Sequence, residues 1–153
     1  MINSVFGELT YEYGWNGKTT IDWYGEMISV DLVVSGEEDE EIDSLQCESY
    51  EKFKLAWSDV KDSILERVLS YYINLRNELG YGDDSNENYP AISNIDEIKN
   101  IITLDSIVVP LSVVYDGRSI ALAFHCGWDA ENGLGIILVN EEIHDIGYQD
   151  IAF

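Results

Sequence analysis

The sequence predicts an α+β fold in which an antiparallel β-sheet packs against one long central helix. Apolar residues recur at three- and four-residue steps across residues 48–79, which is the pattern of an amphipathic helix. On both sides of this segment, short apolar or alternating stretches are separated by Gly, Asn and Asp, as in strands joined by turns. Helices placed between two sets of antiparallel strands are typical of α+β domains. A chain of 153 residues with 46% apolar residues is expected to form one domain over residues 1–153.

The N-terminal part predicts a three-stranded antiparallel meander. Residues 5–13 alternate apolar and polar side chains, and residues 14–17, Gly-Trp-Asn-Gly with an Asn-Gly pair, predict the tight turn of a β-hairpin. Residues 18–24 supply the returning strand, and residues 27–35 supply the third strand. Strands that follow one another in sequence usually pair, which gives the meander.

The central helix is expected to bury one stripe of its surface, formed by Phe53, Trp57, Val60, Ile64 and Val68. An unbroken helix over residues 48–79 would be about 48 Å long. A globule of this size is only about 40 Å across. We therefore expect a kink or break at residues 57–59, where Ser and Asp favour helix caps over helix interiors. Gly80 is expected to end the helix.

The C-terminal part predicts an exposed loop, a short helix and four strands. Residues 81–93 have loop composition, and Ser93 or Asn94 caps a short helix that runs to about residue 102. Strands are expected over residues 106–115, 119–128 and 133–139, with residues 142–153 closing the sheet. Pro110 directs its strand to a sheet edge or a bulge, because proline lacks the N–H that a central strand needs.

The charge of the chain limits its partners. Thirty acidic and eight basic residues give a net charge of −22, carried by the parts that flank the helix. Self-repulsion at this level works against a compact state, which suggests a functional reason for the charge. Nucleic acids and anionic membranes are poor partners for such a chain. No long apolar run or signal peptide is evident, so we expect a cytoplasmic protein that is a monomer when alone.

Two acidic loops are the predicted partner-binding segments. The first, residues 37–41, cannot be core; it is a solvated loop, a docking site for a basic partner or a calcium loop. The calcium interpretation is the weakest, because the ligand alternation, central Gly and final Glu of such loops are missing. The predicted partner-binding residues of both loops are Glu37, Glu38, Asp39, Glu40, Glu41, Asp83, Asp84 and Glu87.

No catalytic residue, metal site or cofactor is predicted. Cys47 and Cys126 lack metal-binding spacing and are expected to be free thiols. His125 is adjacent to Cys126 in a strand, so the two side chains point to opposite faces. Asp129 and Glu131 lie in the one polar cluster of an apolar stretch; turn chemistry explains them, and paired carboxylates for hydrolysis are the alternative.

Residues 124–135 read Phe-His-Cys-Gly-Trp-Asp-Ala-Glu-Asn-Gly-Leu-Gly, and residues 146–153 read Ile-Gly-Tyr-Gln-Asp-Ile-Ala-Phe. They resemble a family of small uncharacterised bacterial proteins in which Trp-Asp-x-Glu-His-Gly-Leu-Gly precedes Val-Gly-x-x-Asp. Residues 46–47, 50–53 and 71–72 extend the similarity. Such families resemble immunity proteins of bacterial toxin systems, including contact-dependent growth inhibition. Asn132 replaces the His of that pattern, which favours a fold signature over an active site.

Three functional hypotheses follow. The resemblance implies an acidic immunity protein that binds a cognate toxin domain and covers its active surface; the charge suits a basic toxin such as a nuclease. The second hypothesis is a hydrolytic or metal-dependent enzyme that uses Asp129, Glu131 and the acidic loop at residues 37–41. The third is a scaffold or adaptor with no toxin partner.

Overall fold

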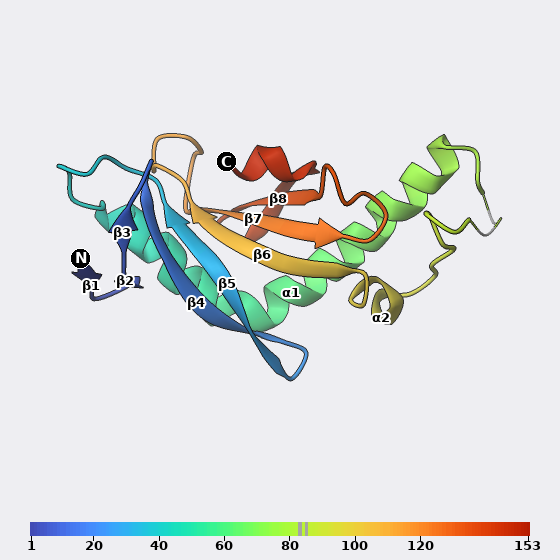
Figure 1. Cartoon of the computed structure of the whole chain (residues 1–153), viewed down its shortest axis with the longest axis horizontal. Coiled ribbons are helices and arrows are strands. Elements are labelled where there is room, and N and C mark those ends of the chain that lie inside the picture. The colour runs from blue at the N-terminus through green and yellow to red at the C-terminus, as the bar shows by residue number, and fades with distance from the viewer. Residues whose placement is uncertain (83, 85) are drawn as a thin grey trace.

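A seven-stranded sheet with one long helix across one face forms the body of the structure (Figure 1), a computed structural model that describes residues 1–82, 84 and 86–153. The predicted α+β class is confirmed. The elements in chain order are β1 (Ile2–Asn3), β2 (Gly7–Glu8), β3 (Thr10–Tyr11), β4 (Trp15–Trp23), β5 (Glu26–Val34), α1 (Ser44–Glu78), α2 (Ile95–Ile98), β6 (Ile102–Val109), β7 (Ser119–Cys126), β8 (Leu134–Val139), β9 (Glu142–Gly147) and the 3-10 helix η1 (Gln149–Ala152).

The strands of the main sheet lie in chain order from β3 to β9, and β1 and β2 form a separate two-stranded sheet. Every neighbouring pair is antiparallel except β5 and β6, which are parallel over Asp31–Val34 and Ser106–Val109. The prediction of a purely antiparallel sheet is therefore wrong at this one junction. The reason is the crossover: α1 carries the chain back along the length of β5, so β6 enters the sheet from the same end (Figure 1).

The first hairpin turns earlier than predicted. Asn16 and Gly17 lie inside β4, and the chain reverses at Tyr13 and Gly14, which have φ of 57° and 138°. The Asn16 side-chain amide donates to the carbonyls of Glu12 and Gly14, each at 2.9 Å. The asparagine therefore stabilises the turn from the strand that follows it. Of the predicted turn at residues 14–17, only Gly14 lies in the reversal, and residues 15–17 belong to β4.

Helix α1 begins earlier than expected and is not interrupted. Asp43 caps it, accepting from the Gln46 backbone N–H at 2.8 Å, while the Gln46 side chain accepts from the Asp43 N–H at 3.3 Å. Of the expected kink or break at residues 57–59, the break is absent, because these residues are helical. The helix axis does change direction midway along its length, as a kink would make it do (Figure 1). Thirty-five residues make a helix about 52 Å long. The molecule is elongated along this helix, so the expectation of a globule about 40 Å across is wrong (Figure 1).

Gly80 ends the helix as predicted. The Tyr81 N–H donates to the Arg76 carbonyl at 3.0 Å and the Gly80 N–H to the Asn77 carbonyl at 3.1 Å, which is the Schellman pattern. None of the helices in the described residues combines the length and the apolar character needed to cross a membrane.

The core lies between α1 and the sheet, and the predicted helix stripe is confirmed. Phe53, Trp57, Val60, Ile64 and Val68 are each at most 6% exposed. They pack against the inward side chains of the central strands, which include Leu32, Val34, Leu104, Leu122, Phe124 and Ile136.

The C-terminal part differs from prediction in three places. Helix α2 is only four residues long, although Asn94 caps it by accepting from the Glu97 N–H at 3.0 Å. Strand β6 lies inside the sheet and stops before Pro110, so proline ends this strand and does not mark an edge. The last strand stops at Gly147, and η1 folds onto β7 and β8 on the face opposite α1. A side chain at Gly135 would lie 2.4 Å from the Tyr148 carbonyl, so glycine permits this close approach.

Candidate partner-binding site

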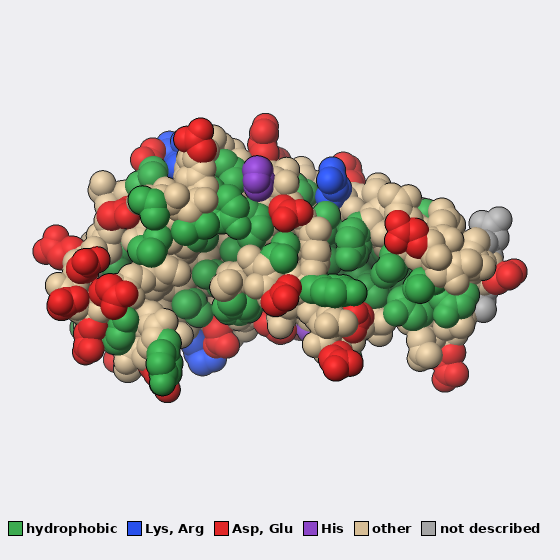
Figure 2. Space-filling view, turned by 90° about the horizontal axis from the view of Figure 1, so that it is seen from above, with side chains coloured by type: hydrophobic (Ala, Val, Ile, Leu, Met, Phe, Trp, Pro, Cys, Tyr) green, Lys and Arg blue, Asp and Glu red, His purple; other side chains and the backbone are tan. Residues whose placement is uncertain are grey.

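The acidic loop at residues 37–41 connects β5 to α1 at one end of the molecule (Figure 1). All five carboxylate side chains are exposed, and Figure 2 shows acidic side chains gathered at the left-hand end of its view. Four ion pairs form among the described residues: Lys18–Asp31, Lys61–Asp22, Lys99–Asp96 and Arg118–Glu141. None of them includes a carboxylate of this loop, so its charge is uncompensated within the described part of the chain.

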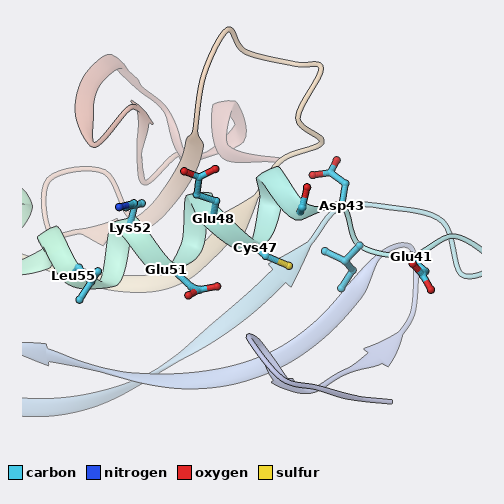
Figure 3. A pocket seen from close by; sticks show the side chains of 9 residues that line it. Glu41, Asp43, Cys47, Glu48, Glu51, Lys52 and Leu55 are labelled. Atoms are coloured by element: carbon cyan, nitrogen blue, oxygen red, sulfur yellow. The ribbon is translucent and has the colours of Figure 1, made fainter.

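A shallow surface beside this loop adds further carboxylates. Residues 41–44 and the first three turns of α1 line a cleft of about 850 Å³, with Glu41, Asp43, Glu48 and Glu51 opposed by Lys52. In Figure 3 Glu48 and Lys52 project from one side of the helix and Cys47 and Glu51 from the other, so the lining wraps around the helix. The surface is open and is not an enclosed cavity.

Apolar side chains lie among these acids. Leu55 is 82% exposed, and the partly buried Ile42 contributes to the same lining. Asp43 has a structural role, because its carboxylate caps α1 and accepts from the Ser112 hydroxyl at 2.7 Å. We call residues 37–41 together with Ile42, Glu48, Glu51 and Leu55 the acidic end.

Trp15 lies behind the acidic loop and has an unused donor. Its side chain is 8% exposed, and its Nε1 is the only buried side-chain nitrogen or oxygen without a hydrogen-bond partner in the described residues. It shares a cleft of about 450 Å³ with residues 38–42. Leaving a buried N–H unpaired costs about 1–3 kcal/mol, so an acceptor that reaches it would be bound favourably.

Tyr11 anchors the start of the loop. Its hydroxyl donates to the Gly36 carbonyl at 3.1 Å, and its ring meets Trp15 edge-on with centroids 5.1 Å apart. Burial raises the pKa of Tyr11, and the nearby carboxylates of Glu37, Glu38 and Asp39 add to that rise. The negative potential of the loop therefore extends to the tyrosine beneath it.

The second acidic loop lies at the opposite end of the molecule. The two loops flank the two ends of α1, which is about 52 Å long, so the structure does not bring them together (Figure 1). Asp84 and Glu87 are exposed, and Asp83 lies outside the described residues. The buried Arg76 guanidinium fixes this loop by donating to the carbonyls of Gly82 at 2.6 Å, of Tyr89 at 3.0 Å and of Asp84.

Asp129 forms a turn, as the first interpretation of residues 128–135 predicted. Its two carboxylate oxygens accept from the Asn132 N–H at 3.1 Å and the Asn132 side-chain amide at 2.9 Å. Gly133 follows with φ of 63°. Glu131 is exposed and forms no hydrogen bond or ion pair with another described residue.

The thiols and imidazoles lie apart from the acidic end, with the exception of Cys47. Both cysteines are free, as predicted, and burial raises the pKa of the Cys126 thiol to about 11. His125 is exposed while Cys126 is buried, which confirms that their side chains point to opposite faces. Among the described residues, no group of three or more His, Cys, Asp and Glu side chains is placed to hold a metal ion.

The family model for a domain of unknown function, DUF6985, matches residues 5–153. The chain belongs to the DUF6985 family. The match covers both the acidic end and the turn at residues 128–135. A search of curated proteins and a search of solved structures each found no match.

Sequence reasoning missed several features of this DUF6985 chain. The unpartnered Trp15 indole and the exposed Leu55 depend on tertiary packing, and their residue types alone carry no signal for them. The early start of α1 was readable from the sequence, since Asp43 and Gln46 have the spacing of a capping box.

Proposed function

We propose that this DUF6985 chain is a non-enzymatic binding protein of the cytoplasm that recognises a basic protein through its acidic end. Its role would be that of an immunity protein, which neutralises a cognate toxin by covering the toxin's active surface. The observation that carries the proposal is the uncompensated loop at residues 37–41, with five exposed carboxylates and no ion pair among the described residues.

Electrostatics gives this loop a functional rationale. A net charge of −22 keeps the chain solvated, but the like charges repel one another and destabilise the compact state. The stability of the fold therefore gives no reason for five acidic residues in one loop. Exposed charges of one sign speed the encounter with an oppositely charged surface. A toxin that acts on nucleic acid presents a basic surface to phosphates, so the acidic end would both attract it and cover it.

The acidic end also has apolar side chains, which can hold a partner in place after charge has attracted it. Protein interfaces hold through a few apolar or aromatic anchors surrounded by a polar rim. The exposed Leu55 and the partly buried Ile42, which line the same surface, fit the anchor role, and Glu41, Glu48 and Glu51 fit the rim. Trp15 and residues 38–42 also line a neighbouring cleft of about 450 Å³, which adds concave surface at this end of the molecule.

Only one end of the molecule fits a single interface of ordinary size. About 800 Å² per partner corresponds to a patch roughly 30 Å across. The two acidic loops flank opposite ends of α1, which is about 52 Å long along its axis (Figure 1). We assign the interface to the acidic end, because it combines uncompensated charge with exposed apolar area. Asp84 and Glu87 would then lie outside it.

The test is co-purification with the product of the gene next to its own. The proposal expects a stable complex and, when both genes are expressed, protection of the host from the partner. Failure of the two products to associate, or protection that persists after five neutral substitutions in residues 37–41 together with Leu55→Asp, would contradict it.

A further inference from the structure

A second cleft lies toward the other end of the molecule, and four of its ten lining residues are aromatic. It has a volume of about 430 Å³ and lies between the C-terminal half of α1, the turn at residues 128–133 and the end of β9. Four aromatic side chains and two carboxylates line it: Tyr71, Tyr89, Trp128, Tyr148, Glu78 and Asp129. No Lys or Arg contributes to its described lining. In Figure 2 side chains coloured as hydrophobic gather toward the right-hand end of the view.

The walls of this cleft are held by contacts behind them. Trp128 is 7% exposed and packs against Tyr72 with ring centroids 4.7 Å apart. Tyr89 stacks on Tyr81 at 5.6 Å, and its carbonyl accepts from the Arg76 guanidinium. Tyr148, at 54% exposed, forms the open side. The aromatic surface is therefore fixed on two sides and accessible on one.

The charges at the cleft have one sign. Asp129 already accepts two hydrogen bonds from Asn132, and each oxygen of a carboxylate keeps a further lone pair. Burial raises the pKa values of Tyr71 and Tyr89, and the neighbouring Asp129 carboxylate adds to both rises. Both phenols therefore stay neutral, and the faces of such rings are electron-rich. Aromatic faces beside carboxylates attract a cation, and they should bind a neutral molecule of the same shape more weakly.

We propose that this cleft binds an organic cation, an alkyl guanidinium or alkyl ammonium group, between its rings, with Glu78 and Asp129 supplying the opposing charge. The site lies apart from the acidic end and does not rest on the function proposed above. The group belongs either to a free small molecule or to an Arg or Lys side chain of a protein, and both present the same chemistry to the rings.

Titration of the full chain with defined probes tests the proposal. Agmatine represents a free guanidinium, N-acetyl-arginine methylamide represents a side chain within a peptide, and N-acetyl-citrulline methylamide is the neutral match of the latter. Binding is followed through the amide and indole N–H signals in two-dimensional NMR spectra. We expect at least one guanidinium probe to bind tenfold or more tightly than the citrulline probe, with shifts centred on residues 71, 89, 128 and 148. Tighter binding of agmatine would indicate a small-molecule ligand, and tighter binding of the arginine probe a peptide.

Variants separate a ring–cation contact from general acidity. Tyr148→Ala and Glu78→Gln should each lower the affinity for the probe by about fivefold. Tyr148→Phe keeps the ring and should bind the probe as tightly as the unsubstituted chain does. Tyr13→Ala is the control, because Tyr13 is fully exposed and lies outside this cleft. Equal binding of the arginine and citrulline probes, an unchanged affinity in Tyr148→Ala, or no shift at 50 mM probe would each overturn the proposal. Spectra of the free variants show whether each one is folded.

Discussion

The indole N–H of Trp57 donates to the backbone carbonyl of Asp22 at 2.7 Å, which joins the middle of α1 to the end of β4. The Asp22 carboxylate also pairs with Lys61, one turn further along the helix, at 3.0 Å. This ion pair and the hydrogen bond of Gly25 to the same carboxylate lower the pKa of Asp22. The long helix is therefore fastened to the sheet by directed polar contacts as well as by its apolar stripe.

The packing of α1 predicts a large penalty for removing one buried ring. Phe53 is fully buried and stacks on Trp57 with centroids 5.3 Å apart. Phe53→Ala should reduce the free energy of unfolding by about 3–5 kcal/mol, as large aromatic deletions in cores do. Leu55→Ala, two positions away and 82% exposed, is the matched control and should change it by less than about 0.5 kcal/mol. Urea unfolding measures both; similar costs for the two would contradict the assigned helix face.

The sequence predicted the helix and its buried face well, and the assembly of the sheet less well. Phe53, Trp57 and Ile64 follow the helical period, which is a local property of the chain. The parallel pairing of β5 with β6 depends on where α1 delivers the chain, and no local pattern encodes that. The separation of the two acidic loops likewise follows from a helix that continues through residues 57–59. The candidate partner-binding residues were predictable as charged loops, but their relative placement was not.

The cap of α1 predicts a smaller and specific loss of stability. Asp43 accepts from the Gln46 N–H and the Ser112 hydroxyl, and the Gln46 side-chain amide donates to the Ser35 carbonyl at 2.9 Å. Asp43→Ala should therefore lower the free energy of unfolding by about 1–2 kcal/mol, since a good N-cap residue is lost. Asp39→Ala removes an exposed carboxylate of the neighbouring loop and should have almost no effect. If the two variants were equally stable, the capping box would not contribute as the geometry indicates.

The buried tyrosines predict a loss of stability at alkaline pH. Burial is the largest cause of raised pKa values at six tyrosines: Tyr11, Tyr24, Tyr50, Tyr71, Tyr72 and Tyr89. In the unfolded chain a tyrosine loses its proton near pH 10, so above that pH the unfolded state releases protons that the folded state keeps. Stability should therefore be intact below about pH 10 and fall as the pH rises beyond it.

Denaturant midpoints measured between pH 7 and pH 11 check this dependence. Tyr24→Phe should make the alkaline decline shallower, because the Tyr24 hydroxyl donates to Asp62 at 2.6 Å and both burial and that carboxylate raise its pKa. The ring that lies under Lys61 and Lys99 is retained in this variant, so the fold at neutral pH should be kept. A midpoint that stays constant or rises up to pH 11 would show that the tyrosines are not held as the structure indicates.

The acidic loop predicts how binding to a basic partner depends on salt. Exposed charges are screened beyond about 8 Å at physiological ionic strength, so the association rate should fall as salt is added. Replacing Glu37, Glu38, Asp39, Glu40 and Glu41 with Gln or Asn should lower that rate about tenfold or more at low salt. The free energy of unfolding should be unchanged or slightly higher, because an exposed loop adds little to the core and its self-repulsion is relieved.

Stopped-flow association of the partner that co-purifies, at two salt concentrations, measures this effect. Asp84→Asn with Glu87→Gln is the matched control, since it also removes carboxylates from an exposed loop but at the far end of α1. Because the two loops lie at opposite ends of α1, well beyond one screening length of about 8 Å, the control should keep an association rate within about twofold of the unsubstituted chain. A rate that is indifferent to salt and to the five substitutions would remove the loop from the interface, and a rate lowered equally by both variants would show that net charge, and not the acidic end, guides the partner.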